Sequence, residues 1–360
     1  MSTTPERWEL GSEFHRVSVT PRGEDEEPSP WELAGVIWTG AGRDGIRLLL
    51  EYGVRTRGWR RCWLPSYLCQ EVVASARSTG IDCALYPWNP LATDRAPSLD
   101  LGDGDVLMVV HQFGLSGRPP WLDSIPSVVD VVEDHTHDPW SSWARSSRAT
   151  YAFASLRKTL PLAEGTPIWS PSGAPLPHQP ALTEIRARAA SLKGEGMRTK
   201  ARYLAGDSVP KDQFRASLLA GESEIASGEV SAISPESLGV LTAFPTVSWR
   251  AARRANAEHL RVRLAGLVGV EMLDWSEDAT PFSAILVLAD RSGRDHLRAH
   301  LIESSIYPAI LWPVAPAELD GITELDRSLA DRMLCVHCDG RYDRSDMDRL
   351  ADAIAGGLAL

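Results

Sequence analysis

The first half of the chain alternates between short apolar runs and amphipathic helical patterns, and this alternation restricts the fold more than any other feature. Strands separated by helices favour a mostly parallel sheet with helices on both faces. The run Val128-Val129-Asp130-Val131-Val132 is β-branched and largely apolar, which is typical of a strand buried in such a sheet. Strands are predicted over residues 34–38, 61–64, 81–86, 106–111, 128–132 and 150–154, with helices from the loop at 39–45 to about 53 and over 70–78.

The second half has a different pattern. Residues from about 180 to 265 are helical and rich in Arg and Glu, with breaks near Pro210 and Pro235, and one segment, 249–267, is long enough to bridge two domains. After it the sequence predicts strands over 282–288, 307–311 and 333–336 and helices over 294–304 and 345–358. The predicted division is a leader over residues 1–33, a large domain over 34–248 and a smaller C-terminal α+β domain over 249–360.

Composition limits the class of protein. A chain of 360 residues that is 43% hydrophobic can bury a large core. Its net charge of −11 argues against general nucleic-acid binding, which needs clustered basic residues. No apolar run approaches the ~20 residues that span a bilayer, and the first 30 residues lack the apolar segment of a secretory signal. With five cysteines, an odd and low count, the sequence predicts reduced thiols and a cytoplasmic location. Cys335 and Cys338 form a C-x-x-C without a second pair, so no metal site is expected.

Lysine is scarce in this chain. Of the 37 basic residues only four are lysines, and Lys158 is the only one in the first 192 residues. Arginine cannot form a Schiff base because its guanidinium stays protonated. Lysine can, once its ammonium loses a proton in a partly dry pocket. Lys158 is therefore a candidate for covalent chemistry, although the four lysines could also be surface residues that escaped the bias.

Acidic residues follow the buried strand at 128–132. Glu133 and Asp134 stand at its carboxyl end, where ligands bind in open α/β sheets. A strand-end Asp followed by a lone Lys is the pair that pyridoxal phosphate (PLP) chemistry requires. The lysine holds the cofactor as an aldimine, and the aspartate keeps the pyridine nitrogen protonated so that the ring acts as an electron sink.

A glycine-rich loop lies between the first predicted strand and the first helix. Residues 40–45, Gly-Ala-Gly-Arg-Asp-Gly, match the G-x-G-x-x-G pattern of dinucleotide-binding folds. In those folds the next strand ends in an acid that binds the ribose, but here it ends in Trp63-Leu64-Pro65-Ser66-Tyr67. The same loop can bind a phosphate monoester, because a helix N-terminus exposes free amides. An ordinary tight turn is the third interpretation.

In this order, the motifs resemble those of the DegT/DnrJ/EryC1/StrS family of PLP-dependent, fold-type-I aminotransferases. The similarity covers roughly residues 35–355 and consists of the glycine loop with its helix (40–50), the turn at 64–69, the strand end at 110–114, the acidic segment at 132–137, the lysine loop at 155–165, and the C-terminal segments at 306–308 and 338–342.

The resemblance implies a site. Lys158 would be the aldimine lysine, Asp134 the partner of the pyridine nitrogen, and His137 would stand near the phenolic oxygen, where the family has Gln. The resemblance implies phosphate donors at Gly42, Arg43 and Ser155, and a ring-stacking residue at Tyr67 or Cys69.

Three departures from the family pattern stand out. The stacking position holds Cys69 in place of an aromatic residue, with Tyr67 two residues earlier. The family's G-x-N-x-R segment, which reaches the phosphate of a neighbouring subunit, has its nearest candidate at Lys193–Arg202. The double glycine after the lysine loop is reduced to Gly165-Thr166.

The resemblance predicts an aminotransferase-like enzyme acting on a small amino or keto substrate, a sugar or natural-product intermediate. It also predicts a homodimer, as does the segment 186–215, which has too few apolar positions for a core helix pair. A PLP enzyme of non-transfer chemistry (elimination, decarboxylation, retro-aldol or oxidation) is an alternative, because His111, His135 and His137 could supply an extra acid or base. A PLP-binding protein without turnover and an NAD-binding oxidoreductase are further alternatives.

Overall fold

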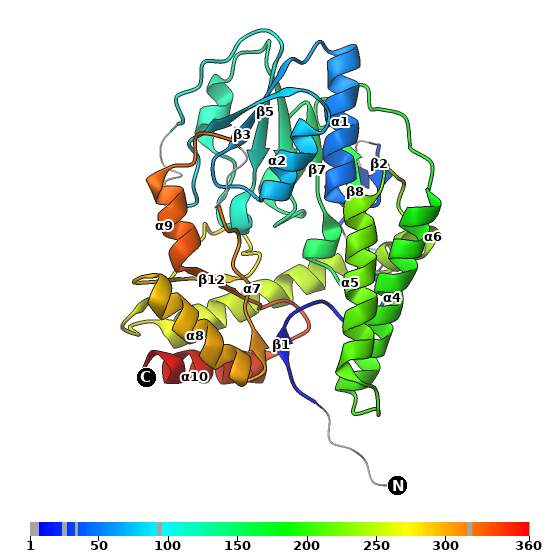
Figure 1. Cartoon of the computed structure of the whole chain (residues 1–360). Coiled ribbons are helices and arrows are strands. Elements are labelled where there is room, and N and C mark those ends of the chain that lie inside the picture. Colours follow the sequence, from blue (N-terminus) through cyan, green and yellow to red (C-terminus); the bar gives the residue numbers. More distant parts are fainter. Residues whose placement is uncertain (1–6, 24–26, 33–34, 92–95, 315–318, 360) are drawn as a thin grey trace.

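The computed structural model describes residues 7–23, 27–32, 35–91, 96–314 and 319–359. A seven-stranded sheet in the order β2-β8-β7-β6-β5-β3-β4 forms its upper part in Figure 1. Neighbouring strands are parallel except where β8 is one of the pair. The prediction of a mostly parallel sheet between helices is confirmed. The strands are β2 (Ile37–Thr39), β3 (Arg61–Pro65), β4 (Asp82–Tyr86), β5 (Asp105–Val110), β6 (Asp130–Asp134), β7 (Tyr151–Phe153) and β8 (Thr166–Trp169).

Alternation along the central strand β5 assigns side chains to the two faces of this sheet. Val106, Met108 and Val110 pack with helices α1 (Gly42–Thr56) and α2 (Gln70–Arg77). Leu107 and Val109 belong to the cluster on the other face, which includes the short helix α3 (Ser142–Arg145). Because both faces are covered, β5 is apolar at every internal position, as expected of a buried parallel strand.

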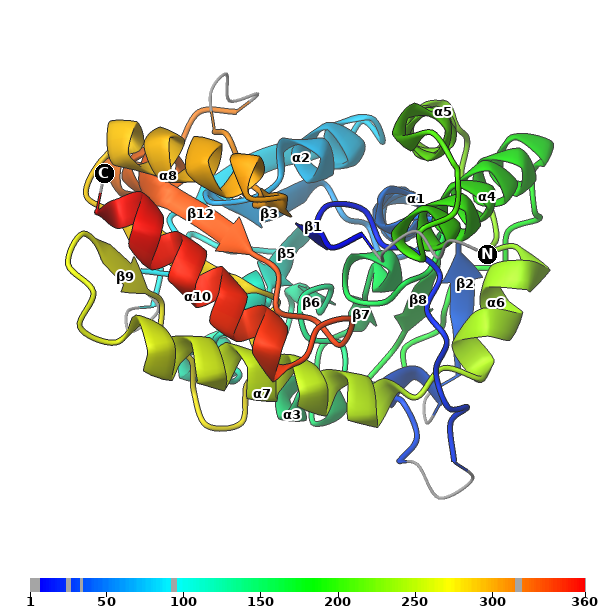
Figure 2. The ribbon, with the colours of Figure 1, turned by 90° about the horizontal axis from the view of Figure 1, so that it is seen from below.

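A second, smaller sheet has the order β12-β10-β9 and is antiparallel. Side chains of α7, α8 and α10 share one core with it, and the three helices lie together in Figure 2. Helix α9 contributes to the core that also holds Met333 and Cys335. The elements are α7 (Thr246–Leu264), β9 (Val270–Met272), β10 (Ala284–Leu288), α8 (Arg291–Glu303), β11 (Ile306–Tyr307), α9 (Glu324–Arg332), β12 (Met333–Val336) and α10 (Arg344–Leu358).

The predicted leader contributes to this second part. Strand β1 (Leu10–Gly11) pairs in parallel with β11, and Leu10 is fully buried in the core of α7, α8 and α10. The division into domains at residues 33 and 248 remains a prediction.

Helices α4 (Glu184–Leu204) and α5 (Lys211–Ser227) form an antiparallel pair beside the large sheet, followed by α6 (Pro235–Thr242) (Figure 1). Helix α4 buries a stripe of three basic residues spaced seven apart, Arg186, Lys193 and Lys200. Each forms an ion pair within the chain: Arg186 with Asp44 at 2.6 Å, Lys193 with Glu222 at 2.7 Å, and Lys200 with Glu9 at 2.7 Å. The scarcity of apolar positions, one motive for predicting a dimer, therefore has an explanation inside the chain.

Several local predictions differ from the structure. The strand predicted at 128–132 begins at Asp130, and Val128 is 62% exposed. Asp130 starts the strand because its carboxylate accepts hydrogen bonds from Arg57, Trp59 and Thr150. The strand predicted at 307–311 is limited to β11, with only a bridge at Ala309 beyond it. The elements β1, β8, β9, α3 and α9 were not predicted from the sequence, and all of them are short.

Candidate active site

A cavity of about 610 Å³ lies at the carboxyl ends of β6 and β7 and at the beginnings of α1 and α2. Its wall also includes residues 12–14 of the N-terminal segment, Tyr307 of β11, and residues 308, 309, 311 and 312 after this strand. Most of the site residues predicted from the sequence line this cavity: Gly42, Arg43, Cys69, Asp134, His137, Ser155 and Lys158. Tyr67 does not.

Lys158 ends a short 3-10 helix (Leu156–Lys158) that follows β7 directly. Its side chain is exposed in the cavity, and its ammonium has no hydrogen-bond or ion-pair partner among the described residues. The positive charge of Arg157, and then the desolvation of the amine by the protein around this open cavity, lower the pKa of Lys158. Both effects favour the neutral amine, the form that attacks a carbonyl carbon.

Asp134 is the last residue of β6 and is buried. The backbone N–H of Thr136 donates to its Oδ1 at 2.9 Å, which orients the carboxylate. Burial raises the pKa of Asp134, and no cationic side chain of the described residues forms an ion pair with it. A cationic ligand group in the cavity would therefore stabilise its charged form.

His137 is held as a neutral hydrogen-bond donor. The backbone N–H of Phe113 donates to its Nδ1 at 2.9 Å, so the ring proton is on Nε2. Burial lowers the pKa of His137 to about 3. The ring stacks on Phe113 and on Trp312, with interplanar angles of 18° and 21°. This packing fixes the direction in which Nε2–H points.

The N-terminus of α1 provides a set of donors for an anion. Its N-cap residue, Ala41, has no side-chain acceptor, and the backbone N–H groups of Gly42 and Arg43 have no acceptor within the described residues. The Ser155 side chain lies close by, because a Cβ on Gly42 would stand 3.2 Å from Ser155 Cβ. Free amides, the helix dipole and a hydroxyl together form a site suited to a phosphate group.

A cluster of ion pairs lies beside this donor set. Glu222 of α5 accepts from both terminal nitrogens of Arg157, at 3.0 and 2.9 Å, and from Lys193 at 2.7 Å. Arg43 lies 3.4 Å from the same carboxylate. Burial alone would raise the pKa of Glu222, but the charges of Arg157 and Lys193 outweigh this effect and lower the pKa to about 2. One carboxylate thus orients three cations, two of which line the cavity.

No family model and no curated protein matches this sequence. Solved structures do. The aminotransferase TlmJ from Streptoalloteichus hindustanus is 18% identical over 92% of this chain and 88% of that chain, with a TM-score of 0.61. The chain has the fold of these aminotransferases. A DegT DnrJ EryC1 StrS aminotransferase from Brucella abortus is 15% identical over 91% of this chain and 87% of that chain, with a TM-score of 0.55. NtdA from Bacillus subtilis, with bound cofactor PMP, is 12% identical over 90% of this chain and 73% of that chain, with a TM-score of 0.58.

The resemblance to the DegT/DnrJ/EryC1/StrS family is thereby confirmed at the level of the fold. In this aminotransferase fold, the glycine loop does not follow the central parallel strand that a dinucleotide-binding site requires. It follows the edge strand β2, whose neighbouring strand in the sheet, β8, is antiparallel. At Gly40 a Cβ would stand 2.6 Å from both Arg186 Cδ and Glu164 Oε2, so the first glycine makes room for a buried ion pair. The dinucleotide interpretation is wrong because strand topology, which the pattern does not contain, decides it.

Tyr67 and Cys69 have different positions. Tyr67 is fully buried, its hydroxyl donates to the carbonyl oxygen of Leu311 at 2.6 Å, and burial raises its pKa. It therefore lies behind the cavity wall. Cys69 lines the cavity as the residue before α2, and burial raises the pKa of its thiol. The aromatic residues on the wall come from other parts of the aminotransferase fold and were not predicted: Phe14, Phe153, Phe282, Tyr307 and Trp312.

Two of the three predicted histidines lie away from the cavity. His135 Nε2 is 2.9 Å from Glu133 Oε2, and His111 packs 4.8 Å from Trp143, on the other side of the sheet. The alternation of β6 is the signal that could have excluded His135, since Glu133 and His135 share a face opposite Asp134. His337 lines the cavity and was missed, because it comes from the distant segment after β12.

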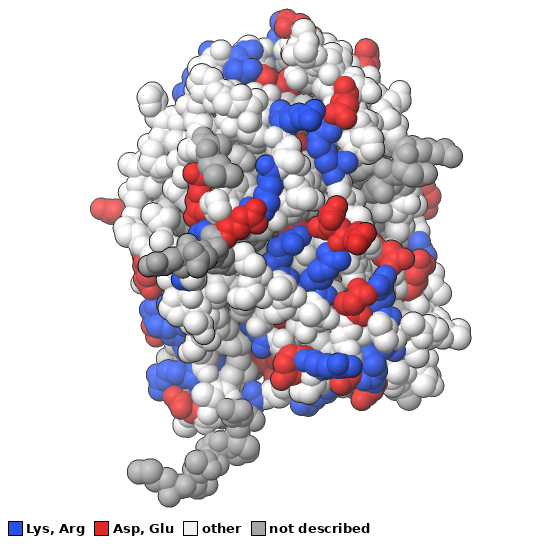
Figure 3. Space-filling view, turned by 180° about the vertical axis from the view of Figure 1, so that it is seen from behind, with Lys and Arg blue, Asp and Glu red and all other residues white. Residues whose placement is uncertain are grey.

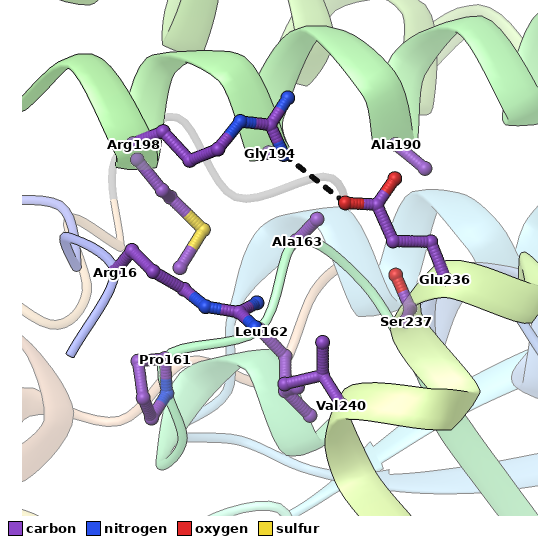
Figure 4. A pocket seen from close by; sticks show the side chains of 11 residues that line it. Arg16, Pro161, Leu162, Ala163, Ala190, Gly194, Arg198, Glu236, Ser237 and Val240 are labelled. Atoms are coloured by element: carbon purple, nitrogen blue, oxygen red, sulfur yellow. Dashed lines mark hydrogen bonds and ion pairs between the residues drawn. The ribbon is translucent and has the colours of Figure 1, made fainter. Parts of the chain in front are cut away.

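The basic residues of the segment Lys193–Arg202 form ion pairs within the chain. Lys193 and Lys200 are buried and paired as described above, Arg198 pairs with Glu236 at 3.1 Å, and Arg202 pairs with Asp207 at 2.8 Å. The ion pair of Arg198 and Glu236 borders a hollow of only about 20 Å³ (Figure 4), room for roughly one water molecule. Within one chain these cations therefore have acidic partners, and the suggestion that the segment reaches a neighbour's phosphate remains a prediction.

The cysteine pair, the charged surface and the remaining helices of the described residues provide no second candidate site. Cys338 and Cys335 are fully buried, and burial raises both thiol pKa values to about 12. The described residues contain no group of three or more metal-ligating side chains. Basic and acidic residues are interspersed on the face shown in Figure 3. In the described part of the chain, no helix has the length and apolar character needed to cross a membrane.

Proposed function

We propose that this chain is a PLP-dependent, aminotransferase-like enzyme that acts on a small amino or keto substrate. One observation carries the proposal: an unpaired amine (Lys158), an uncompensated buried carboxylate (Asp134) and the free amides of Gly42 and Arg43 all line one cavity. PLP has an aldehyde, a basic ring nitrogen and a phosphate monoester. Each group of the cofactor has a matching group in this cavity, so the residues fit it.

Each residue has a separate task. Lys158 would hold the cofactor at its aldehyde through Nζ, and the free amine would move a proton as base and acid. Asp134 would keep the ring nitrogen protonated, and the Nε2–H of His137 would donate to the phenolic oxygen. Ser155 and the amides at the start of α1 hold the phosphate. The bound cofactor supplies an electron sink.

A sugar or natural-product intermediate is the proposed substrate class. DesI, which was solved in the presence of its TDP-sugar product, has a TM-score of 0.59 with this chain at 16% identity. A cavity of about 610 Å³ is within the range of small-molecule sites. The proposal includes a cytoplasmic homodimer; light scattering that showed a fully active monomer would contradict the dimer.

The first experiment is a visible absorption spectrum of the protein purified with PLP. A yellow band that borohydride bleaches is expected, and mass spectrometry of the reduced protein should place the adduct on the peptide that contains Lys158. The peptides with Lys193, Lys200 and Lys211 serve as internal controls. A band of the same intensity in Lys158→Ala, or an adduct on another lysine, would refute the assignment.

The second experiment tests the reaction type. Incubation with glutamate or glutamine should convert the bound cofactor to pyridoxamine phosphate. Elimination, decarboxylation or retro-aldol chemistry would need an additional acid or base. His111 and His135 lie outside the cavity and His137 is neutral, so fewer groups can supply one. If neither these nor other common amino donors convert the cofactor, while some substrate loses CO₂, water or ammonia, the amino-transfer proposal fails.

A further inference from the structure

Three arginines line the cavity, and they differ in their partners. Arg43 and Arg157 share the carboxylate of Glu222. Arg298 of α8 has no acidic partner within 4 Å among the described residues. Its Nε is covered by protein atoms and has no hydrogen-bond acceptor there. The half-buried guanidinium thus carries a charge with no acidic partner at the cavity wall, and it therefore suggests an anionic ligand at its terminal nitrogens.

The two glutamates on the cavity wall do not compensate Arg298. Glu71 lies 3.5 Å from Arg43, and Glu13 lies 3.7 Å from Lys193. The buried Asp134 accepts from Thr136 and forms no ion pair. Positive charge is thus in excess on the side of the cavity that α8 provides.

Tyr307 of β11 lines the same cavity and can assist Arg298. Its hydroxyl oxygen accepts a hydrogen bond from Lys211 Nζ at 2.9 Å. Since the oxygen accepts, its own proton remains for a second acceptor. Lys211 is itself held by Glu9 at 3.2 Å, so the tyrosine is fixed in position.

We propose that Arg298, with Tyr307, forms a subsite for an anionic group of the substrate. A guanidinium binds a carboxylate or a phosphate with two parallel hydrogen bonds, so the group is a carboxylate of the amino donor or the diphosphate of a nucleotide-linked substrate. This inference deepens the proposed function, because it places the reactants in the same cavity as Lys158. Arg298 contacts the substrate and takes no part in bond making.

The experiment is isothermal titration calorimetry with two non-reactive probes, glutarate and thymidine diphosphate, on the full chain loaded with PLP and on the chain without it. Arg298→Gln should weaken at least one probe by about tenfold or more, because both hydrogen bonds and the charge are lost. Arg298→Lys keeps the charge but not the paired geometry and should bind with intermediate affinity. Arg291→Gln is the matched control: it lies on the same helix, is exposed, and pairs with Asp295 at 3.8 Å.

The results distinguish a carboxylate from a diphosphate as the bound group, and they test the anion subsite separately from the proposed PLP-dependent function. Weaker glutarate binding alone identifies a carboxylate, and weaker thymidine diphosphate binding alone identifies a diphosphate. If wild-type protein binds neither probe, or Arg298→Gln binds both as tightly as wild type, the subsite does not exist. A chain that takes up no PLP but still binds a probe through Arg298 refutes the proposed function and retains the subsite. Thermal unfolding should show that Arg298→Gln folds normally, because no internal ion pair is removed.

Discussion

Asp134→Asn separates the catalytic from the structural role of the strand-end carboxylate. Asparagine has the same shape, and its amide oxygen can still accept the 2.9 Å hydrogen bond from Thr136. Replacing a charged acceptor by a neutral one costs about 1 kcal/mol, and removing a buried charge that has no ion-pair partner offsets this cost. The net change in the free energy of unfolding should lie within about 1 kcal/mol, which shifts the melting temperature of a chain of this size by less than about 4 °C.

The effect on turnover should be much larger. Without its anionic partner the ring nitrogen of bound PLP is no longer held protonated, and a positioned electrostatic partner of this kind contributes about 10²–10³ in rate, or roughly 3–4 kcal/mol. The assays are steady-state turnover with an amino donor and the melting temperature of the chain without PLP. Wild-type turnover in Asp134→Asn would show that the residue only caps the strand. A large loss of stability in the protein without PLP would show that its role is structural.

Other predictions concern the phosphate site, the ion-pair cluster and pH. In a fluorescence titration, Gly42→Ala should weaken PLP binding about tenfold or more, because the new methyl group stands 3.2 Å from Ser155 Cβ. The control Gly239→Ala in α6 should leave PLP binding unchanged, because no atom lies within 4 Å of the new methyl group. Glu222→Gln should lower the free energy of unfolding in urea by about 2 kcal/mol, a value discounted for the partial exposure of Glu222. Because the charge of Glu222 raises the pKa of Lys158, the same substitution should lower that pKa in a spectroscopic pH titration. An unchanged pKa of Lys158 would contradict the assigned role of Glu222. Because burial lowers the pKa of His137 to about 3 while the unfolded chain takes up that proton near 6.5, the free energy of unfolding should fall as pH decreases from about 6.5 to 3. His137→Gln should reduce this slope by about 1.4 kcal/mol per pH unit, and the exposed control His296→Gln should not; equal slopes for both would refute the argument.

Residue type and order along the chain were sufficient to predict much of the candidate site. Lys158 was identifiable because lysine is rare here, and Asp134 because it ends an apolar strand. Gly42 and Ser155 followed from the motif order. Their proximity in the cavity follows from a general property of α/β sheets, since the carboxyl ends of parallel strands meet at one edge. Such residues depend on local structure that the sequence encodes directly.

Other residues could not be found in this way. Arg298, Tyr307 and His337 reach the cavity only because the second sheet packs beside the first. Nothing in the local sequence distinguishes Arg298 and His337 from surface residues, and Tyr307 belonged to the similar segment 306–308 without a predicted role. Tyr67 and Cys69 are both near the predicted stacking position, and side-chain packing determined that only Cys69 faces the cavity.

The sequence by itself determined the fold class, the parallel sheet and the pair of residues around which the site is built, because these depend on hydrophobic period and residue chemistry over short distances. Only the tertiary structure decided how the cavity is closed. The pairing of β1 with β11 brings residues 10–11 beside 306–307 and places Glu13 and Phe14 on the wall, although nearly 300 positions separate the strands. The buried basic stripe of α4 likewise depends on acids at Glu9, Asp44 and Glu222. The partners in such long-range pairings cannot be read from the sequence, because each is selected by its neighbours in space and not by its neighbours in the chain.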